Sequence, residues 1–346
     1  SGSVVIFDSG EGPTTVLNGF TLRNGRANWG GGVYCGISSP TLNNCRVIAN
    51  KVLWDGAGIY CSAGSSPALT NCSFVDNDAD ELPASDGGGM YCAAGSSPTL
   101  DNCSFVNNIA SSEGGGICLD VDVFSGAGSS ATLNNCVFAG NSCPYGGGAI
   151  LCRSSSLTLV NCTFKGNSAN ISGGGGICFY SGSSGTLDNC VFEDNYADWE
   201  GGGVLCYTSS PTFKNCVFRS NEAVFGGGMA CKNSSPFLSN CVFKDNDAVY
   251  GGGLECQSSA PTLDNCTFTG NTASIGSGMH ATGSPAPTLK NCIVWGNVAT
   301  NIEGAVDGAT YSCIQGGWGH PWFGTGCIDT DPFFATGPAG DCYLSQ

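Results

Sequence analysis

The most constraining feature of this sequence is a unit of 25 to 33 residues that recurs ten times. Each copy carries glycines, a cysteine, a Ser/Pro turn and an Asn-Cys pair, followed by an apolar residue and an asparagine; residues 30–50 form a clear copy. The Asn-Cys pairs stand at 44/45, 71/72, 102/103, 135/136, 161/162, 189/190, 215/216, 240/241, 265/266 and 291/292. A unit of this size cannot bury its own apolar side, so neighbouring units must stack on one another.

The pattern inside each unit favours strands over helices. No 3.6-residue periodicity is present, and three short extended pieces alternate with Gly, Ser-Pro or Asn punctuation. Asn44 breaks the alternation and is predicted to turn a corner in the left-handed conformation, and Asn50 is predicted to do the same at the next corner. The sequence therefore predicts an all-β parallel solenoid of about 12 coils with three strands per coil, stacked about 4.8 Å apart.

The interior of such a solenoid can be read as columns of equivalent residues. A leucine column is predicted at Leu17, Leu42, Leu69, Leu100, Leu133, Leu159, Leu187, Phe213, Leu238, Leu263 and Leu289. A mostly phenylalanine column follows at Leu22, Val47, Phe74, Phe105, Phe138, Phe164, Phe192, Phe218, Phe243, Phe268 and Val294. A small-residue column runs from Ala27 to Ala299. We expect one domain over 1–346, with an opening coil at 1–29, ten Cys-containing repeats at 30–300 and degenerate coils at 301–346.

Charge and composition limit the classes of function that are expected for the protein. The formal net charge is −16 with only 11 Lys and Arg, which argues against a nucleic-acid partner. No apolar run reaches the roughly 18 residues of a membrane helix, so no membrane insertion is expected in this segment. Twenty-three cysteines and an acidic composition suit a secreted or cell-surface protein whose cysteines form disulfides.

The tail carries a family resemblance. Residues 311–318 read Tyr-Ser-Cys-Ile-Gln-Gly-Gly-Trp, and residues 329–333 read Asp-Thr-Asp-Pro-Phe. Together with the repeats, these motifs resemble secreted bacterial right-handed parallel β-helix proteins of the pectate-lyase-like superfamily. The repeats are also similar to those of chlamydial polymorphic outer-membrane proteins and autotransporter passengers. The resemblance implies a right-handed β-helix, and it raises the question of polysaccharide lyase or hydrolase activity.

The cysteines leave three arrangements open: pairs within a coil, pairs between coils, or free thiols in the core. Pairing within a coil is favoured because the opening coil lacks both partners. The candidate pairs are Cys35/Cys45, Cys61/Cys72, Cys92/Cys103, Cys118/Cys136, Cys152/Cys162, Cys178/Cys190, Cys206/Cys216, Cys231/Cys241 and Cys256/Cys266. Cys118 and Cys178 lie one residue out of phase with the glycine run, which predicts a local bulge at each. Cys143, in the small-residue column, is the candidate free thiol.

Acidic residues in the early repeats are the candidate metal ligands. We expect no resident cofactor apart from a possible Ca²⁺ bound by Glu113, Asp120 and Asp122, because oxygen donors suit this ion. Arg153 could lie over Asp120 one coil later. The clustered Asp residues with Gly-His-Gly of the hydrolases are missing, so no catalytic residue is assigned and the protein is predicted not to be an enzyme.

Aromatic residues near the glycine runs form a candidate binding surface: Trp29, Trp54, Tyr145, Trp199, Phe225 and Tyr250. The rings could stack on sugars or a partner, or simply cover the glycine strip. We interpret the chain as a non-enzymatic extracellular structural protein, a head-to-tail self-associating fibre, stalk or adhesin module. The alternative is a β-helix that binds polysaccharide or cleaves it with Ca²⁺, using the acidic early loops.

Overall fold

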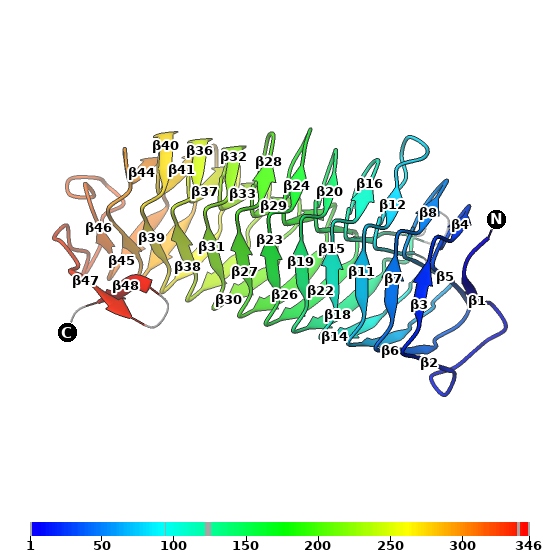
Figure 1. Ribbon diagram of the computed structural model, residues 1–346. Coiled ribbons are helices and arrows are strands. Elements are labelled where there is room, and N and C mark those ends of the chain that lie inside the picture. The colour runs from blue at the N-terminus through cyan, green and yellow to red at the C-terminus, as the bar shows by residue number, and fades with distance from the viewer. Residues whose placement is uncertain (1, 94, 122–125, 338–339, 345–346) are drawn as a thin grey trace.

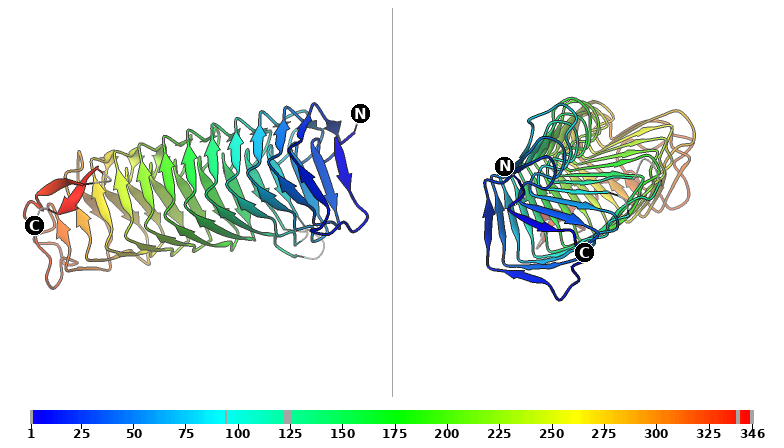
Figure 2. Two further views of the ribbon diagram at one scale, coloured as in Figure 1. Left: turned by 60° about the horizontal axis from the view of Figure 1, so that its bottom comes forward. Right: turned by 90° about the vertical axis from the view of Figure 1, so that its right-hand side faces the viewer.

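Four parallel β-sheets run along the molecule and wrap into a solenoid (Figure 1). The computed structural model describes residues 2–93, 95–121, 126–337 and 340–344. Figure 2 shows the sheets enclosing the core and the termini at opposite ends of the rod. The predicted all-β parallel solenoid is confirmed, and the described residues contain no helix.

Sheets A, B and C contain twelve strands each, and sheet D contains ten. Sheet A consists of β1 (Val5–Phe7), β5 (Val33–Gly36), β9 (Ile59–Ser62), β13 (Met90–Cys92), β17 (Ile117–Leu119), β21 (Ile150–Arg153), β25 (Ile177–Tyr180), β29 (Val204–Tyr207), β33 (Met229–Lys232), β37 (Leu254–Gln257), β41 (Met279–Thr282) and β44 (Ile302–Gly304). Sheet B runs from β2 (Val16–Asn18) to β45 (Gly308–Thr310), and sheet C from β3 (Thr21–Arg23) to β46 (Cys313–Ile314).

Sheet D corrects the predicted three strands per coil. It runs from β4 (Arg26–Ala27) to β40 (Thr272–Ile275), and most of its early strands have only two residues. Two residues are too few to show alternation in the sequence, so this sheet appeared there only as the small-residue column. Ala299, the last predicted member of that column, lies beyond sheet D and is exposed.

The predicted leucine and phenylalanine columns are confirmed by the register of sheets B and C. Leu17 pairs with Leu42 and Leu42 with Leu69 in sheet B. In sheet C the eight rings from Phe74 to Phe268 stack nearly parallel, with centroids 4.4–5.0 Å apart. Strands in register place identical side chains on top of one another, so the core is a set of continuous stacks.

The first predicted corner is confirmed and the second is shifted by one residue. Asn44 has φ 52° and its equivalents up to Asn291 are also left-handed. At the second corner the left-handed residue is Ala49 (φ 52°), while Asn50 is fully buried. The position before the buried asparagine is therefore the turn, and it is often Asp, Asn, Ser or Gly elsewhere because these tolerate positive φ.

The buried asparagines form a hydrogen-bonded file inside the solenoid. Nδ2 of Asn141 donates to Oδ1 of Asn167 at 2.9 Å and to the carbonyl of Phe105 at 3.0 Å. The same pattern repeats from Asn50 to Asn297, and no described side chain leaves a buried nitrogen or oxygen without a partner. The file satisfies the polar groups that a tight interior corner would otherwise leave unpaired.

The glycine runs let the chain cross from sheet D to sheet A in close contact with the next coil. Gly87 has φ +66°, and a Cβ on Gly88 would lie 2.3 Å from the carbonyl oxygen of Ile109. Any larger residue would separate the coils at this point. We call the residues directly before the left-handed glycine of each crossing the arm file: Trp29, Asp55, Asp86, Glu113, Gly146, Gly173, Glu200, Phe225, Tyr250 and Ile275.

The C-terminal end of the stack is partly covered by its own chain. Phe323 bridges to Ala309 of β45, and Ile328 bridges to Cys313 of β46. Trp322 and Phe323 pack against the core. Beyond them, β47 (Phe334–Gly337) and β48 (Gly340–Leu344) form an antiparallel hairpin.

Candidate functional site

The outer face of sheet A brings together the charged and aromatic residues predicted to be functional. Residues alternate along each strand, so two files point away from the core. We define outer file 1 as Ile6, Tyr34, Tyr60, Tyr91, Cys118, Leu151, Cys178, Leu205, Ala230, Glu255, His280 and Glu303. Outer file 2 contains Asp120, Arg153, Tyr180, Tyr207, Lys232, Gln257 and Thr282. The arm file lies beside them.

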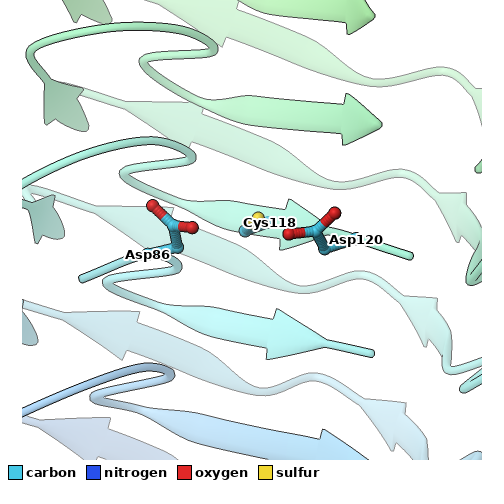
Figure 3. Close-up of side chains that lie close together, drawn as sticks. All are labelled: Asp86, Cys118 and Asp120. Carbon is cyan, nitrogen blue, oxygen red and sulfur yellow. The ribbon is translucent and has the colours of Figure 1, made fainter. Parts of the chain in front are cut away.

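A cluster of carboxylates and one thiol lies at the early end of this face. Figure 3 shows Asp86, from the arm file, and Asp120 on either side of Cys118. One ligand atom of each residue lies within 4.8 Å of the other two. Asp55 extends the cluster, because its Oδ1 accepts the backbone N–H of Asp86 at 2.9 Å. The same contact repeats one coil later, where Oδ1 of Asp86 accepts the N–H of Glu113 at 2.9 Å.

The cluster perturbs the acidity of its members. Burial raises the pKa of Asp55 to about 7 and that of Asp86 to about 6. Burial also raises the pKa of Asp120, and burial together with the nearby carboxylates raises the pKa of the Cys118 thiol. Each of these groups loses water contact and faces like charges, so the ionised forms are disfavoured.

Arg153 joins two of the predicted metal ligands. Its Nη1 lies 3.1 Å from Oδ2 of Asp120, and its Nη2 contacts the carboxylate of Glu113. The structure therefore brings Glu113 and Asp120 together as predicted, but on a guanidinium group. Asp122, the third predicted ligand, lies outside the described residues. Asp55 and Cys118 were not among the predicted ligands. The sequence does carry a signal for the alignment of the carboxylates, because Asp55, Asp86 and Glu113 all directly precede glycine runs.

A ladder of rings and cations continues along outer file 2. The Tyr180 and Tyr207 rings stack with centroids 5.1 Å apart. The Arg153 guanidinium lies over the Tyr180 ring, 5.8 Å from its centroid, and the Lys232 ammonium lies over the Tyr207 ring, 5.6 Å from its centroid. Lys232 also pairs with Glu200 of the arm file at 3.0 Å. Cation–π contacts and ion pairs thus hold these side chains in one ordered row.

The predicted surface aromatics do not form one platform. Trp29, Trp54, Tyr145 and Trp199 are exposed, whereas Phe225 and Tyr250 are half-buried and stack on each other at 5.0 Å. Trp199 meets Phe225 edge-on at 5.3 Å. Trp29, Phe225 and Tyr250 belong to the arm file, whereas the other three residues each stand one position before it. Their rings cover the edge of sheet A in separate groups.

A buried ion pair lies near the far end of outer file 1. Nδ1 of His280 is 2.8 Å from Oε2 of Glu255, whose residue is only 1 % exposed. The ring of Tyr250 covers His280 at 5.6 Å. The hydrogen bond to Glu255 raises the pKa of His280.

The cysteines are arranged differently from the predicted within-coil disulfides, beginning with the first predicted pair, Cys35/Cys45. Both residues are buried free thiols, and no disulfide joins any two of the cysteines from Cys35 to Cys327. The thiol of Cys45 donates to the carbonyl oxygens of Leu17 and Asn43, at 3.4 and 3.2 Å. Cys35 instead lies in register with Cys61 of the next coil of sheet A. The prediction therefore has to be corrected from a covalent rung to two separate thiols that fill space in the core.

The same correction applies to the other predicted pairs. The following cysteines are likewise buried free thiols: Cys61, Cys72, Cys92, Cys103, Cys118, Cys136, Cys152, Cys162, Cys178, Cys190, Cys206, Cys216, Cys231, Cys241, Cys256 and Cys266. The thiol of Cys103 interacts with those of Cys72 and Cys136, in the coils below and above. Cys231 interacts likewise with Cys206 and Cys256. In-register strands stack equivalent sulfurs, so the near neighbours of these thiols lie along the file rather than across the coil.

Cys118 and Cys178 depart furthest from the predicted pairs Cys118/Cys136 and Cys178/Cys190. Sheet A stays in register through both positions without the predicted bulge, so both side chains point outward while Cys136 and Cys190 face the core. They pack instead with Leu151, Leu205 and other outer residues in a separate apolar cluster. Cys143 is buried in sheet D, and burial raises its pKa to about 12.

None of the described residues forms a helix that is long and apolar enough to span a membrane.

Two comparisons with known proteins show which family the chain belongs to. No curated protein matches the chain. A family model described as "Right handed beta helix region" matches residues 5–122 and 107–259. Since these matches cover well over half of the chain and the structure is a parallel solenoid, the protein belongs to the right-handed β-helix family.

Proposed function

We propose that this protein is a non-enzymatic extracellular β-helix that binds a polysaccharide along the outer face of sheet A. The observation that carries the proposal is outer file 2, which presents a polar or aromatic side chain on six successive coils, from Asp120 to Gln257. The coils repeat about every 4.8 Å, so the face offers similar groups at regular steps to a polymer of repeating units.

The row is ordered before any ligand arrives. The faces of Tyr180 and Tyr207 are occupied by each other and by the neighbouring cations, so a bound glycan would meet ring edges, hydroxyl groups and charged heads. Ordered side chains lose little conformational entropy on binding, which favours affinity. Hydroxyl and charged groups that are already aligned can hydrogen-bond to successive sugar hydroxyls.

Charge favours a neutral polymer over an acidic one. Arg153 is paired with Glu113 and Asp120, and Lys232 with Glu200, so neither cation is available to a uronate. The net charge of −16 would also repel a polyanion.

Affinity electrophoresis tests the proposal. The chain is run through gels containing a soluble neutral β-glucan, a xylan or polygalacturonate. We expect retardation by at least one neutral polymer, and a dissociation constant at least fivefold weaker for Tyr180→Ala. The matched control is Phe237→Ala, an aromatic residue that is 39 % exposed on the outer face of sheet B, against 40 % for Tyr180.

Three outcomes would overturn the proposal. Migration unaffected by all three polymers would exclude polysaccharide binding at this face, and equal losses for Tyr180→Ala and Phe237→Ala would place binding elsewhere. Release of reducing ends or unsaturated products on prolonged incubation would make the protein an enzyme, with the carboxylates around Asp86 as the first candidates.

A further inference from the structure

We propose that Asp86, Cys118 and Asp120 form a Zn²⁺ site on the outer face of sheet A. The site shares Asp120 with the first position of outer file 2, and it does not depend on glycan binding. Its donor set differs from the all-oxygen Ca²⁺ site predicted from the sequence, because one donor is a thiol.

The geometry suits a small metal ion. One donor atom from each residue lies within 4.8 Å of the other two (Figure 3). Ligand atoms around a tetrahedral zinc lie ~3.3–3.8 Å apart, given bond lengths of ~2.0–2.3 Å. Small side-chain rotations would therefore bring the three donors to bonding distance and leave a fourth position for water.

The Cys118 thiol is the independent evidence that the carboxylates surround a ligand position. Its residue is fully buried, and its sulfur has no hydrogen-bond partner among the described residues. The thiols of the Asn-Cys pairs have such contacts; Cys72, for example, donates to the carbonyl oxygens of Leu42 and Thr70 at 3.4 Å each. Cys118 packs in the same apolar cluster as Leu151 and Cys178, but it also has Asp86 and Asp120 as neighbours, and these carboxylates are the partners expected around a metal.

Neighbouring groups hold the two carboxylates in place. Val121 donates its backbone N–H to Oδ1 of Asp120 at 2.7 Å, and Arg153 binds Oδ2 of the same carboxylate. Asp86 is held by the backbone N–H of Glu113. Such outer contacts fix the orientation of metal ligands. Two carboxylates and a thiolate carry three negative charges, of which Zn²⁺ would neutralise two, and Arg153 adds one positive charge that Asp120 shares with Glu113.

The donor set identifies the class of metal. Ca²⁺ takes six to eight oxygen ligands, whereas zinc accepts sulfur and carboxylate oxygen in four-coordinate sites. The cluster offers only two carboxylates beside the thiol, which are too few oxygen donors for a Ca²⁺ site.

Cobalt substitution tests the site in the full chain, purified without metal and under reducing conditions. We expect one equivalent of Co²⁺ to produce a thiolate-to-cobalt charge-transfer band in the near ultraviolet, and Zn²⁺ to abolish it. Cys118→Ser should remove the band. Cys178→Ser is the matched control and should keep the band, since Cys178 is also buried on outer file 1 and lies in the same apolar cluster, but it is not part of the carboxylate group around Cys118.

A second variant guards against misfolding of Cys118→Ser. The double variant Asp86→Asn, Asp120→Asn keeps every thiol and should weaken Co²⁺ binding at least tenfold, with an unchanged far-ultraviolet circular dichroism spectrum. A band that survives in Cys118→Ser would place the metal on other thiols and overturn the proposal. Absence of binding at micromolar Co²⁺ or Zn²⁺, or displacement of Co²⁺ by equimolar Ca²⁺, would do the same.

Discussion

At the scale of single residues, the buried asparagine file is the feature on which the interior corner depends. Oδ1 of Asn167 accepts both the backbone N–H and the Nδ2 group of Asn141, at 3.0 and 2.9 Å. Its own Nδ2 donates to the carbonyl of Phe138 at 3.1 Å. The same Nδ2 also donates to Oδ1 of Asn195 at 2.9 Å, so one side chain satisfies four buried groups of its neighbours.

We expect Asn167→Ala to be strongly destabilising. Each buried group left unpaired costs about 1–3 kcal/mol, and this change leaves several. Asn161→Gly is the control, because Asn161 is an exposed corner residue with φ 55° that glycine adopts freely. Urea unfolding measures both. A loss for Asn167→Ala no larger than that for Asn161→Gly would contradict the role assigned to the file.

The Glu255–His280 pair predicts a pH dependence of stability. Glu255 raises the pKa of His280 in the folded state above the unfolded value of about 6.5. The contribution of the pair to the free energy of unfolding is therefore fully present below pH ~6.5 and is lost as the pH rises through the folded-state pKa of His280. We expect the difference in unfolding free energy between the natural chain and His280→Gln to be largest at pH 5.5–6.5 and to shrink at alkaline pH. An equal difference at acidic and alkaline pH would contradict this role of the pair.

At the scale of the elements, the arm-to-sheet crossing determines how closely the coils approach. A Cβ on Gly148 would lie 2.4 Å from the carbonyl oxygen of Gly175 and 2.5 Å from that of Ser168, so only glycine fits. The same close approach places the arm file against the outer files of sheet A. The candidate sites on this face thus depend on backbone contacts that lie behind them.

Replacing one such glycine should weaken the stack more than replacing a glycine in open space. We expect Gly148→Ala to lower the melting temperature by several degrees, because backbone rather than a movable side chain must give way. Gly12→Ala, where a Cβ would meet nothing within 4 Å and φ is not positive, should leave it unchanged. Equal melting temperatures for the two variants would show that the coils can move apart without loss of stability.

The phenylalanine stack of sheet C leads to a second prediction about the stability of the sheets. Phe164 lies between Phe138 and Phe192 at 5.0 and 4.8 Å and is fully buried. Phe164→Ala should cost about 3–5 kcal/mol, the usual range for a buried aromatic residue. Phe237→Ala, on the exposed face of sheet B, should cost far less. A small loss at Phe164, measured by denaturant unfolding, would mean that the stack closes over the cavity.

The sequence predicted those parts of the fold that repeat. Period and alternation identify Leu42, Phe74 and their equivalents, since in-register stacking gives every coil the same pattern. Sheet D was missed because its strands are too short to alternate. The outward positions of Cys118 and Cys178 were missed because a cysteine was assumed to face its repeat's other cysteine. The Asp86–Cys118–Asp120 cluster joins an arm residue of one coil with strand residues of the next, a contact that no single repeat encodes.

At the scale of the whole molecule, the two ends differ. The edges of sheets B and C at the C-terminal end already pair with Phe323 and Ile328. The first coil exposes Val4, Ile6, Val16 and Phe20. The head-to-tail fibre predicted from the sequence would have to join these unlike surfaces, and the covered edges are not available for strand pairing.

We therefore expect single rods in solution. Negative-stain electron microscopy and sedimentation at high protein concentration measure this directly, and Phe20→Asp reports on the exposed surface of the first coil. Filaments that lengthen with concentration and are lost in Phe20→Asp would contradict this expectation and support the fibre.

The buried asparagine file also makes the rod electrically polar along its axis. Each Nδ2 donates toward the next coil, from Asn50 to Asn77 at the start and from Asn271 to Asn297 near the end, so the amide dipoles point the same way. The exposed corner file runs in the opposite sense, since Asn71 donates back to Asn44. Water screens the outer file, whereas the inner one lies in a low-dielectric core where aligned dipoles add and polarise one another. The interior is therefore relatively positive toward its C-terminal end, a directional field that follows from one repeated side chain.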